Sequence, residues 1–203
     1  MSGITVHVVD DDASFCRAMA RLLRTGGHTV QTYSSAAAFL EGCQHPQRGC
    51  VISDLHMPGM NGLELQEAMR RAGHAMPVIF LTGNGDIPST VSAMQQGAVD
   101  YLEKCAPREK LMEAVQRALE REVAEHQQRQ EQRQLQSRLA TLSGREREVL
   151  SAVVQGKMNK EISADLGIHE RTVKLHRTSI TTKLKVQSVA ELTRLWIQAG
   201  NRS

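Results

Sequence analysis

The feature that most constrains the fold is the alternation of short apolar runs with amphipathic, helix-period segments through about the first 120 residues. Five runs have the length and composition of strands: Ile4–Val9, Thr29–Tyr33, Cys50–Ser53, Val78–Leu81 and Val99–Leu102. Segments with helical period fall at about residues 14–25, 35–42, 61–72, 87–96 and 108–125. The alternation predicts an α/β domain in which helices cover both faces of a doubly wound, five-stranded parallel sheet. Such strands are commonly wound in the order 2-1-3-4-5, with the ligand site at their carboxyl ends.

From Leu142 onward the strand pattern gives way to short helical segments. A capping box, Ser143-x-x-Glu146, starts the first of them, and Gly156 stops it. Helices are predicted at about residues 143–155, 160–166, 170–184 and 189–199. Two short helices around the turn at Gly167, with flanking helices, predict an all-α helix-turn-helix module.

Residues 119–140 join these two parts, contain no Gly or Pro, and are rich in the good helix formers Gln, Arg and Glu. The apolar residues of this linker are too sparse for a self-sufficient coiled coil: Leu119, Val123, Leu135 and Leu139. We expect a helical extension that either pairs weakly across a dimer or is a solvated spacer. The predicted domains are residues 1–118, the helical linker 119–140, and residues 141–203.

The formal net charge of +3 is unevenly distributed along the chain. Residues 1–118 hold 10 basic and 12 acidic side chains, whereas residues 119–203 hold 15 basic and 10 acidic ones. An acidic front and a basic back suggest that only the back half binds a polyanion.

Composition also bears on where the chain works. No apolar run approaches the roughly 18 residues that span a membrane, and the first residues lack the pattern of a signal peptide, so a cytoplasmic location is expected. The four cysteines show no C-x-x-C pairing, which argues against a disulfide framework or a zinc site.

Several carboxylates follow two of the predicted strands. Asp10, Asp11 and Asp12 come after the first strand, and Asp54 comes after the third. These strands are neighbours in the predicted sheet, so their ends bring the acids into one cleft. A divalent cation would relieve the repulsion between them, and Mg²⁺ suits the site because it prefers oxygen ligands and retains waters. Any one of these acids alone could be only a helix cap.

Thr82 and Lys104 lie at the ends of two further strands and should face the same cleft. A hydroxyl and an ammonium beside a metal-bound carboxylate are what a phosphoryl group on that carboxylate requires. Asp54 is therefore predicted to be a nucleophile that forms an acyl phosphate. Taken singly, Thr82 could be a turn residue and Lys104 a solvated charge, so the inference depends on the ordered set.

Residues 1–118 resemble a response-regulator receiver domain, which has a flavodoxin-like fold. The motifs that carry the resemblance are VVDDD (8–12), SDLHMPGMNG (53–62), FLTGNGD (80–86) and GAVDYLEK (97–104). The resemblance implies Asp54 as phosphoacceptor, and magnesium ligands from Asp10, Asp11, Asp54 and the backbone carbonyl of His56. It implies Thr82, Tyr101 and Lys104 as the switch and phosphoryl-binding residues.

One departure from that family follows the lysine. Receiver domains usually have Pro directly after it, often with a cis peptide bond, and here Cys105 follows Lys104 while Pro stands at position 107. A non-proline cis bond costs about 2.5–4 kcal/mol, so we expect a trans bond or an altered loop, which affects the placement of Lys104. Lys104 could also favour the thiolate of Cys105, which would allow a redox role.

The segment Glu170–Lys185 is amphipathic at about 3.6 residues per turn. Its apolar face holds Val173, Ile180 and Leu184 and should pack on the core of the module. The opposite face offers cations for phosphates, hydroxyls for bases or phosphates, and a leucine suited to a thymine methyl group: Arg171, Lys174, Leu175, Thr178, Thr181 and Lys185. The pattern alone is also typical of an ordinary helix with a solvated basic side.

Residues 142–196 resemble the LuxR-type helix-turn-helix of NarL/FixJ response regulators. The motifs are LSGREREVL (142–150), GKMNKEISADLGI (156–168), RTVKLHR (171–177) and KLKVQSVAEL (183–192). The resemblance implies that residues 170–184 enter the major groove and adds Arg177 to the DNA-binding residues. Met158 and His169 stand where the family often has a capping Ser, and we expect Asn159 to cap in place of the first.

Together the two resemblances point to the FixJ-like branch of two-component response regulators. They imply phosphorylation of Asp54 by a histidine kinase with Mg²⁺, and a switch that biases the face near residues 87–118. That face would promote homodimerisation, or release the DNA-binding module to bind promoter DNA, with RNA polymerase as a further candidate partner.

Two other function classes compete with this one. An enzyme such as a phosphatase or phosphotransferase would need a second general-acid constellation, which the sequence does not show, so no enzyme is expected. A phosphorylation-independent or redox-tuned DNA-binding regulator is the remaining alternative, and unchanged DNA binding in Asp54→Ala would favour it.

Overall fold

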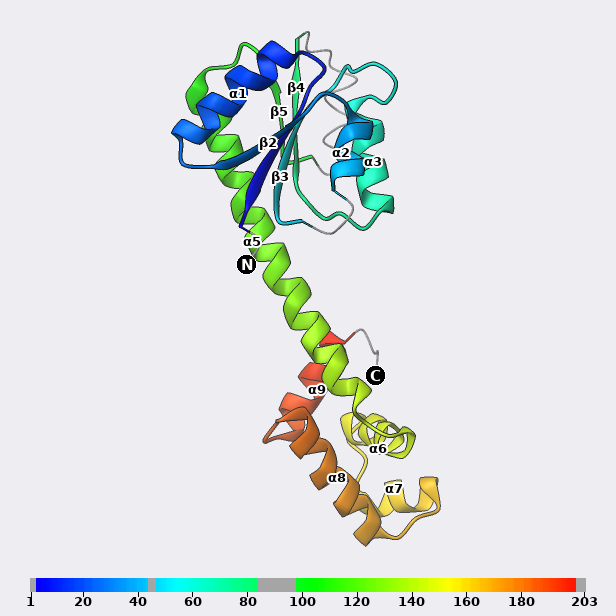
Figure 1. Ribbon diagram of the computed structural model, residues 1–203. Coiled ribbons are helices and arrows are strands. Elements are labelled where there is room, and N and C mark those ends of the chain that lie inside the picture. Colours follow the sequence, from blue (N-terminus) through cyan, green and yellow to red (C-terminus); the bar gives the residue numbers. More distant parts are fainter. Residues whose placement is uncertain (1–2, 44–46, 84–97, 200–203) are drawn as a thin grey trace. The chain divides into compact units, whose positions relative to one another are not determined.

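The computed structural model describes residues 3–43, 47–83 and 98–199 (Figure 1). The chain divides after Glu125 into two compact units, residues 1–125 and 126–203, and each is described by itself. None of the described helices is long and apolar enough to cross a membrane.

The first unit is built on a parallel sheet, as predicted. In the described residues its strands are β1 (Thr5–Val9), β2 (Thr29–Tyr33), β3 (Gly49–Asp54), β4 (Val78–Thr82) and β5 (Asp100–Glu103). Their order is β2-β1-β3-β4-β5, which confirms the expected topology. Strands β3 and β4 are buried along their whole length, as is typical of parallel strands covered on both faces.

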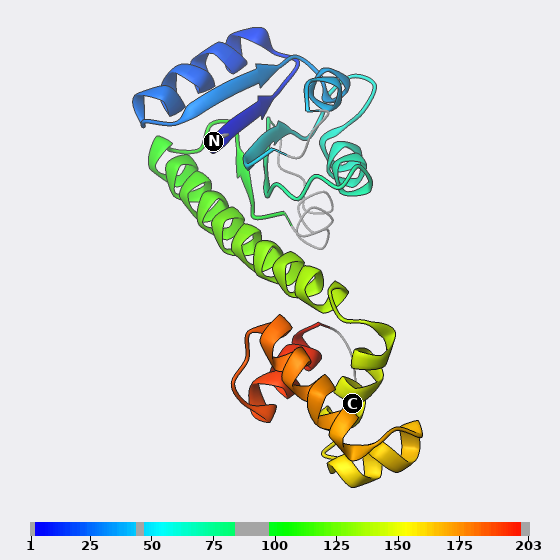
Figure 2. The ribbon, with the colours of Figure 1, turned by 60° about the horizontal axis from the view of Figure 1, so that its bottom comes forward.

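Helices cover both faces of this sheet (Figures 1 and 2). On one face, α1 (Ala13–Thr25) and the first part of α5 (Arg108–Ala140) pack on apolar side chains of β1, β3 and β4. On the other face lie α2 (Ala36–Gly42) and α3 (Gly62–Arg71). The helix predicted at residues 87–96 lies outside the described residues.

The predicted element boundaries needed small corrections. The last strand begins at Asp100 rather than Val99, and β3 is longer than predicted because it includes Gly49 and Asp54. Gly49 has φ +146°, and a Cβ there would lie 1.7 Å from the carbonyl oxygen of Thr5. Only glycine permits this close approach of β3 to β1.

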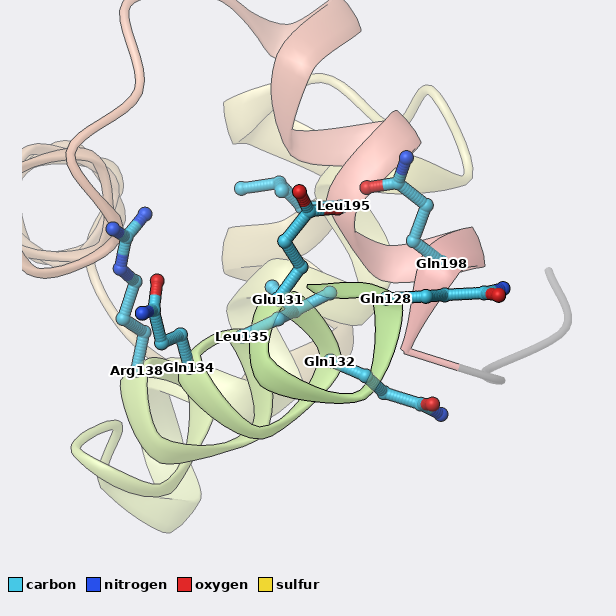
Figure 3. A pocket seen from close by; sticks show the side chains of 8 residues that line it. All are labelled: Gln128, Glu131, Gln132, Gln134, Leu135, Arg138, Leu195 and Gln198. Atoms are coloured by element: carbon cyan, nitrogen blue, oxygen red, sulfur yellow. The ribbon is translucent and has the colours of Figure 1, made fainter. Parts of the chain in front are cut away.

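The helix predicted to end at residue 125 continues without a break to Ala140, through the whole predicted linker. The absence of Gly and Pro explains why it does not stop. Leu135 is only 8% exposed, and Leu139 packs against the apolar core of the second unit. Leu135 also faces Leu195 across a groove lined mainly by Gln, Glu and Arg side chains (Figure 3). Leu135 is therefore buried within the second unit, and Leu139 is partly buried there, so neither is a fully solvated residue of a spacer.

The second unit contains α6 (Gly144–Val154), α7 (Asn159–Leu166), α8 (Glu170–Leu184) and α9 (Val189–Gln198). Their buried face confirms the predicted module: Leu142, Val149, Leu150, Val153, Ile162, Val173, Ile180, Leu184 and Leu192. Gly167 closes α7 in the left-handed conformation, at φ 61°, which turns the chain into α8. The predicted capping box is present, because Ser143 Oγ accepts from the Glu146 N–H at 3.2 Å and Glu146 Oε2 accepts from the Ser143 N–H at 2.7 Å.

The prediction that Asn159 caps α7 was wrong. The N-cap is Met158, whose backbone N–H donates to Glu161 Oε2 at 2.6 Å, so a residue inside the helix satisfies the cap. The Asn159 side chain instead accepts from Arg177 Nη1 at 2.8 Å. His169 precedes α8 without a side-chain cap bond, and α8 still spans the predicted range.

A buried histidine should make the first unit sensitive to mild acid. His7 is fully buried in β1, with its ring 5.9 Å from that of Tyr33 and 5.6 Å from that of Phe39. Burial, assisted by the nearby His74, lowers the pKa of His7 from 6.5 to about 4. The unfolded chain therefore binds a proton between these pH values that the folded chain cannot bind, and stability falls as pH falls from 6.5 to 4.

We expect this loss to reach about 3 kcal/mol near pH 4, since one pKa unit corresponds to about 1.36 kcal/mol. Urea unfolding between pH 7 and pH 4.5, followed by circular dichroism, measures it. His7→Gln cannot titrate in this range and should show a flatter pH dependence. An equal slope in both proteins would contradict the assignment.

Candidate functional site

The carboxylates that the sequence predicts to converge do so at the carboxyl ends of β1 and β3. Val9 pairs with Ser53 in the register of these strands, which brings the following residues, Asp10 and Asp54, side by side. One carboxylate oxygen each from Asp10, Asp11 and Asp54 lies within 4.8 Å of the others. Two of these acids are buried and Asp11 is exposed. Such an all-oxygen set with one side open to solvent fits a divalent cation that keeps part of its water shell.

Lys104 completes the pocket. Its Nζ lies 2.9 Å from Asp54 Oδ2 and 2.7 Å from Asp10 Oδ2. Burial alone would lower the pKa of Lys104, but the contacts with the two carboxylates outweigh burial and raise it. Burial raises the pKa of Asp10, although hydrogen bonds from Lys104 and from the Asp12 backbone oppose this. The lysine is thus a fixed cation between two acids of the cluster.

The departure at Cys105 leaves this placement intact. The described residues contain no cis peptide bond, so the Lys104–Cys105 bond is trans, as expected. The Lys104 N–H donates to the Thr82 carbonyl at 2.8 Å, which anchors the turn after β5. The exposed Cys105 thiol donates to Glu103 Oε2 at 3.3 Å, so its partner is a carboxylate rather than the lysine.

The two residues predicted as a switch lie on adjacent strands. Thr82 is the last residue of β4, fully buried, on the strand next to that of Asp54. Tyr101 lies in β5, and its ring packs against the apolar cluster beneath α2 and α3. Its hydroxyl is buried and has no hydrogen-bond partner in the described part of the chain.

The other predicted residues surround the pocket. His56 follows β3 and is exposed, and its backbone N–H donates to Asp54 Oδ1 at 3.2 Å. Asp12 caps α1 by accepting from the Ser14 N–H at 2.7 Å and the Phe15 N–H at 3.2 Å, which lowers its pKa. It therefore stabilises a helix end, whereas Asp10 and Asp11 take part in the cluster.

Two features of the pocket were missed from the sequence. The Lys104 ammonium lies 4.6 Å from the centre of the Phe15 ring, a cation–π contact. Gly62 begins α3 where a Cβ would lie 2.5 Å from the backbone oxygen of Asp54. The signals were an aromatic residue soon after the acids and a glycine opening a helix, and both patterns are common in proteins without such a pocket.

The predicted DNA-binding face of α8 is open to solvent. Arg171, Lys174, Thr178 and Lys185 are exposed, and the Leu175 side chain is 65% exposed, whereas Thr181 is half-buried. The opposite side of the helix is buried, as predicted. A leucine this exposed is unexplained by packing within the module.

The cations of residues 144–199 separate into two groups. Those with partners in the described residues are Arg145, Arg147, Lys157, Arg177 and Lys183. Within the described part of the chain no side-chain partner is found for Lys160, Arg171, Lys174, Lys185 or Arg194. The open side of α8 thus presents unpaired positive charge. Arg177, which the sequence grouped with these cations, is half-buried and ties α8 to α7 through Asn159.

These two parts define a class of protein: a regulator with a carboxylate pocket suited to phosphoryl transfer in one unit and a DNA-binding module in the other. Two family models match the chain. The response regulator receiver domain matches residues 6–116, and the luxR family of bacterial regulatory proteins matches residues 140–196. The chain therefore belongs to the two-component response regulators that carry a LuxR-type DNA-binding domain, a family of transcriptional regulators rather than enzymes.

Similar proteins match over nearly the whole chain. Transcriptional regulatory protein FixJ of Azorhizobium caulinodans is 42% identical over 97% of this chain and 93% of its own length. Response regulator protein TodT of Pseudomonas putida is 37% identical over 94% of this chain and 84% of its own length.

Solved structures agree. Response regulator StyR superposes with a TM-score of 0.86 at 42% identity, covering 96% of this chain and 98% of that one. Full-length FixJ from B. japonicum gives a TM-score of 0.60 at 34% identity, with 98% of both chains covered. The predicted relationship to FixJ-like regulators is confirmed.

Proposed function

We propose that phosphorylation of Asp54 by a histidine kinase controls the binding of α8 to promoter DNA. The observation that carries this proposal is the cluster of Asp10, Asp11 and Asp54 within 4.8 Å, with the Lys104 ammonium 2.9 Å from Asp54 Oδ2. The working parts are the receiver at 1–118, the linker at 119–140 and the DNA-binding domain at 141–203, acting in the cytoplasm.

Each residue of the pocket has a role in this proposal. An Asp54 oxygen attacks the phosphorus of the kinase's phosphohistidine, the P–N bond breaks, and the imidazole leaves. Asp10, Asp11, Asp54 and the His56 carbonyl would hold Mg²⁺, which when bound would supply positive charge that stabilises the transferring group. The Lys104 ammonium, which forms an ion pair with the Asp54 carboxylate, would pair with the new phosphoryl oxygens.

Thr82 and Tyr101 would respond to phosphorylation of Asp54 by changing conformation. The Thr82 hydroxyl lies at the end of the strand beside Asp54 and would donate to a phosphoryl oxygen. Movement of Thr82 toward the phosphoryl group would favour a state in which the Tyr101 ring is turned toward the interior of the first unit. The packing of this ring against the apolar cluster beneath α2 and α3 supports the existence of such a state. Phosphorylation shifts the equilibrium only as far as it stabilises this state over the alternative. The favoured state would dimerise, or free the DNA-binding module.

On DNA, Arg171, Lys174 and Lys185 would contact phosphates, and Leu175 would contact a thymine methyl group. The hydroxyls of Thr178 and Thr181 would reach bases or phosphates, and we assign to Arg177 a positioning role through Asn159. Two copies would bind half-sites about one helical turn apart, or a multiple of that, and could then contact RNA polymerase.

The test is DNA binding and molecular mass, measured with Mg²⁺ in the presence and absence of beryllofluoride. The probe is a duplex enriched from a random-sequence pool by the beryllofluoride-treated protein. We expect binding at least about tenfold tighter with beryllofluoride, the size of a coupling free energy near 1.4 kcal/mol, and a shift from monomer to dimer mass.

Asp54→Ala removes the phosphoacceptor and should show neither change. If beryllofluoride raises the DNA affinity of wild type without changing its mass, dimerisation is not the mechanism. Release of the DNA-binding module would then be the remaining mechanism. Equal and tight DNA binding by both proteins under all conditions would instead favour a phosphorylation-independent regulator.

A further inference from the structure

Lys185 closes α8 in an unusual backbone conformation. Its φ is 56° and its ψ is 48°, in the left-handed region. In the described part of the chain every other residue with positive φ is a glycine. Gly167 closes α7 in nearly the same conformation, with φ 61° and ψ 38°. The chain therefore uses glycine at one helix end and lysine at a neighbouring one.

A side chain in this conformation is unfavourable, because its Cβ crowds the backbone. Glycine avoids the crowding, which is why it is the usual residue at such helix ends. A lysine in place of glycine at this position is therefore expected to lower the stability of the fold.

No contact within the fold explains the lysine. The side chain is exposed, and its ammonium has no partner among the described residues. The bonds that end the helix come from the backbone: Lys185 N–H to the Thr182 carbonyl at 3.3 Å, and Val186 N–H to the Thr181 carbonyl at 3.1 Å. Glycine would make the same bonds.

The position of Lys185 suggests what the side chain does. It continues the exposed stripe of α8 that begins with Arg171 and Lys174, which also lack partners in the described part of the chain. From Arg171 to Lys185 the helix rises about 21 Å, at 1.5 Å per residue. This exceeds the roughly 12 Å width of the major groove, so cations at the two ends can reach phosphates on opposite sides of it.

We propose that Lys185 is a phosphate anchor, retained for DNA binding in spite of the strained backbone that it requires. This inference rests on the proposed function and deepens it. The ligand of the ammonium is a phosphate of the DNA backbone, so the contact adds affinity without sequence preference.

Lys185→Gly separates the two effects because they have opposite signs. We expect its thermal midpoint to rise by about 4–8 °C, the shift that relief of roughly 1 kcal/mol gives in a unit of this size. We expect its DNA affinity, in the beryllofluoride-treated full chain, to fall about fivefold to tenfold for the enriched and a scrambled duplex alike. The slope of log affinity against log salt should weaken by about 1, as for one lost phosphate contact.

Two variants serve as controls. Lys185→Arg keeps the charge and should bind DNA like wild type. Arg194→Ala removes an exposed cation of α9, which also lacks a partner among the described residues, and should change neither midpoint nor affinity. If Lys185→Gly leaves the DNA affinity and the salt slope unchanged, Lys185 does not contact a DNA phosphate. If it leaves the thermal midpoint unchanged, the left-handed conformation of Lys185 does not cost stability. If wild type itself fails to bind either duplex, the proposed function fails as well.

Discussion

Arg48→Ala is expected to destabilise the unit formed by residues 1–125 by about 3–5 kcal/mol, the usual effect of leaving a buried charge without its partner. The buried charge is Glu122, whose side chain is 2% exposed. Arg48 binds both of its oxygens, Nε to Oε1 at 3.1 Å and Nη2 to Oε2 at 2.9 Å. The same carboxylate adds to the effect of burial in raising the pKa of the Cys50 thiol to about 12.

Arg48 is held in place independently of this pair. Its carbonyl accepts from the Thr5 N–H at 3.0 Å, and the following Gly49 packs against the backbone of Thr5. Glu122 lies one helical turn beyond Ala118, and Ala118 is fully buried. Glu122 also lies beyond residues 6–116, which match the receiver family. The ion pair therefore fixes α5 to the first unit for about one turn past the receiver core.

The two partners should respond differently to mutation. Glu122→Leu leaves Arg48, which is 32% exposed and can be solvated, so the loss should be far smaller than in Arg48→Ala. Urea unfolding measures both variants, with circular dichroism reporting both units. The only tryptophan of the chain is Trp196, in the second unit, so its fluorescence should be unaffected by these changes. Equal losses in the two variants would contradict the asymmetry.

Much of the fold could be predicted because periodicity is local. Alternating apolar runs identify strands, and in a parallel sheet the residues that follow neighbouring strands meet at one edge. Asp10 and Asp54 could therefore be placed together although they are far apart in the chain. The same reasoning oriented α8, because its 3.6-residue period shows which side is buried.

Pairings between specific polar side chains could not be predicted in this way. Arg48 and Glu122 are 74 residues apart, and periodicity says only that each lies near the end of an element. The Arg177–Asn159 bond likewise depends on how α7 and α8 cross. The burial of Leu135 likewise depends on tertiary packing within the second unit.

A second such pairing gives the other large effect. Glu146, predicted only as part of a capping box, is 5% exposed and accepts from Lys183 Nζ at 2.7 and 2.8 Å. Ser179 Oγ also donates to it at 2.6 Å, so the carboxylate joins α6 to α8. The bonds from Lys183 and Ser179, followed by that of the Ser143 N–H, lower the pKa of Glu146 to about 2.

Lys183→Met should therefore destabilise the second unit by roughly 3 kcal/mol, because it leaves the Glu146 carboxylate buried without a cation. Urea unfolding followed by Trp196 fluorescence measures the loss at pH 7. In wild type the contribution of Glu146 is complete above pH 4.5 and is lost as pH falls toward 2, since protonation removes the charge that Lys183 binds. The variant should show a weaker dependence in this window.

Lys174→Met is the matched control, because it removes an exposed cation of the same helix for which no partner is found in the described residues. Its stability should stay within about 0.5 kcal/mol of wild type, as for most surface substitutions. Its DNA binding should weaken, whereas Lys183→Met should retain salt-dependent DNA binding under conditions where it is folded. Equal stability of the two variants would mean that the ion pair does not hold α8 in place. The lysines of α8 and its C-cap would thus have separate roles, because Lys183 pairs with Glu146, whereas Lys174 and Lys185 have no partner among the described residues and are proposed to contact DNA.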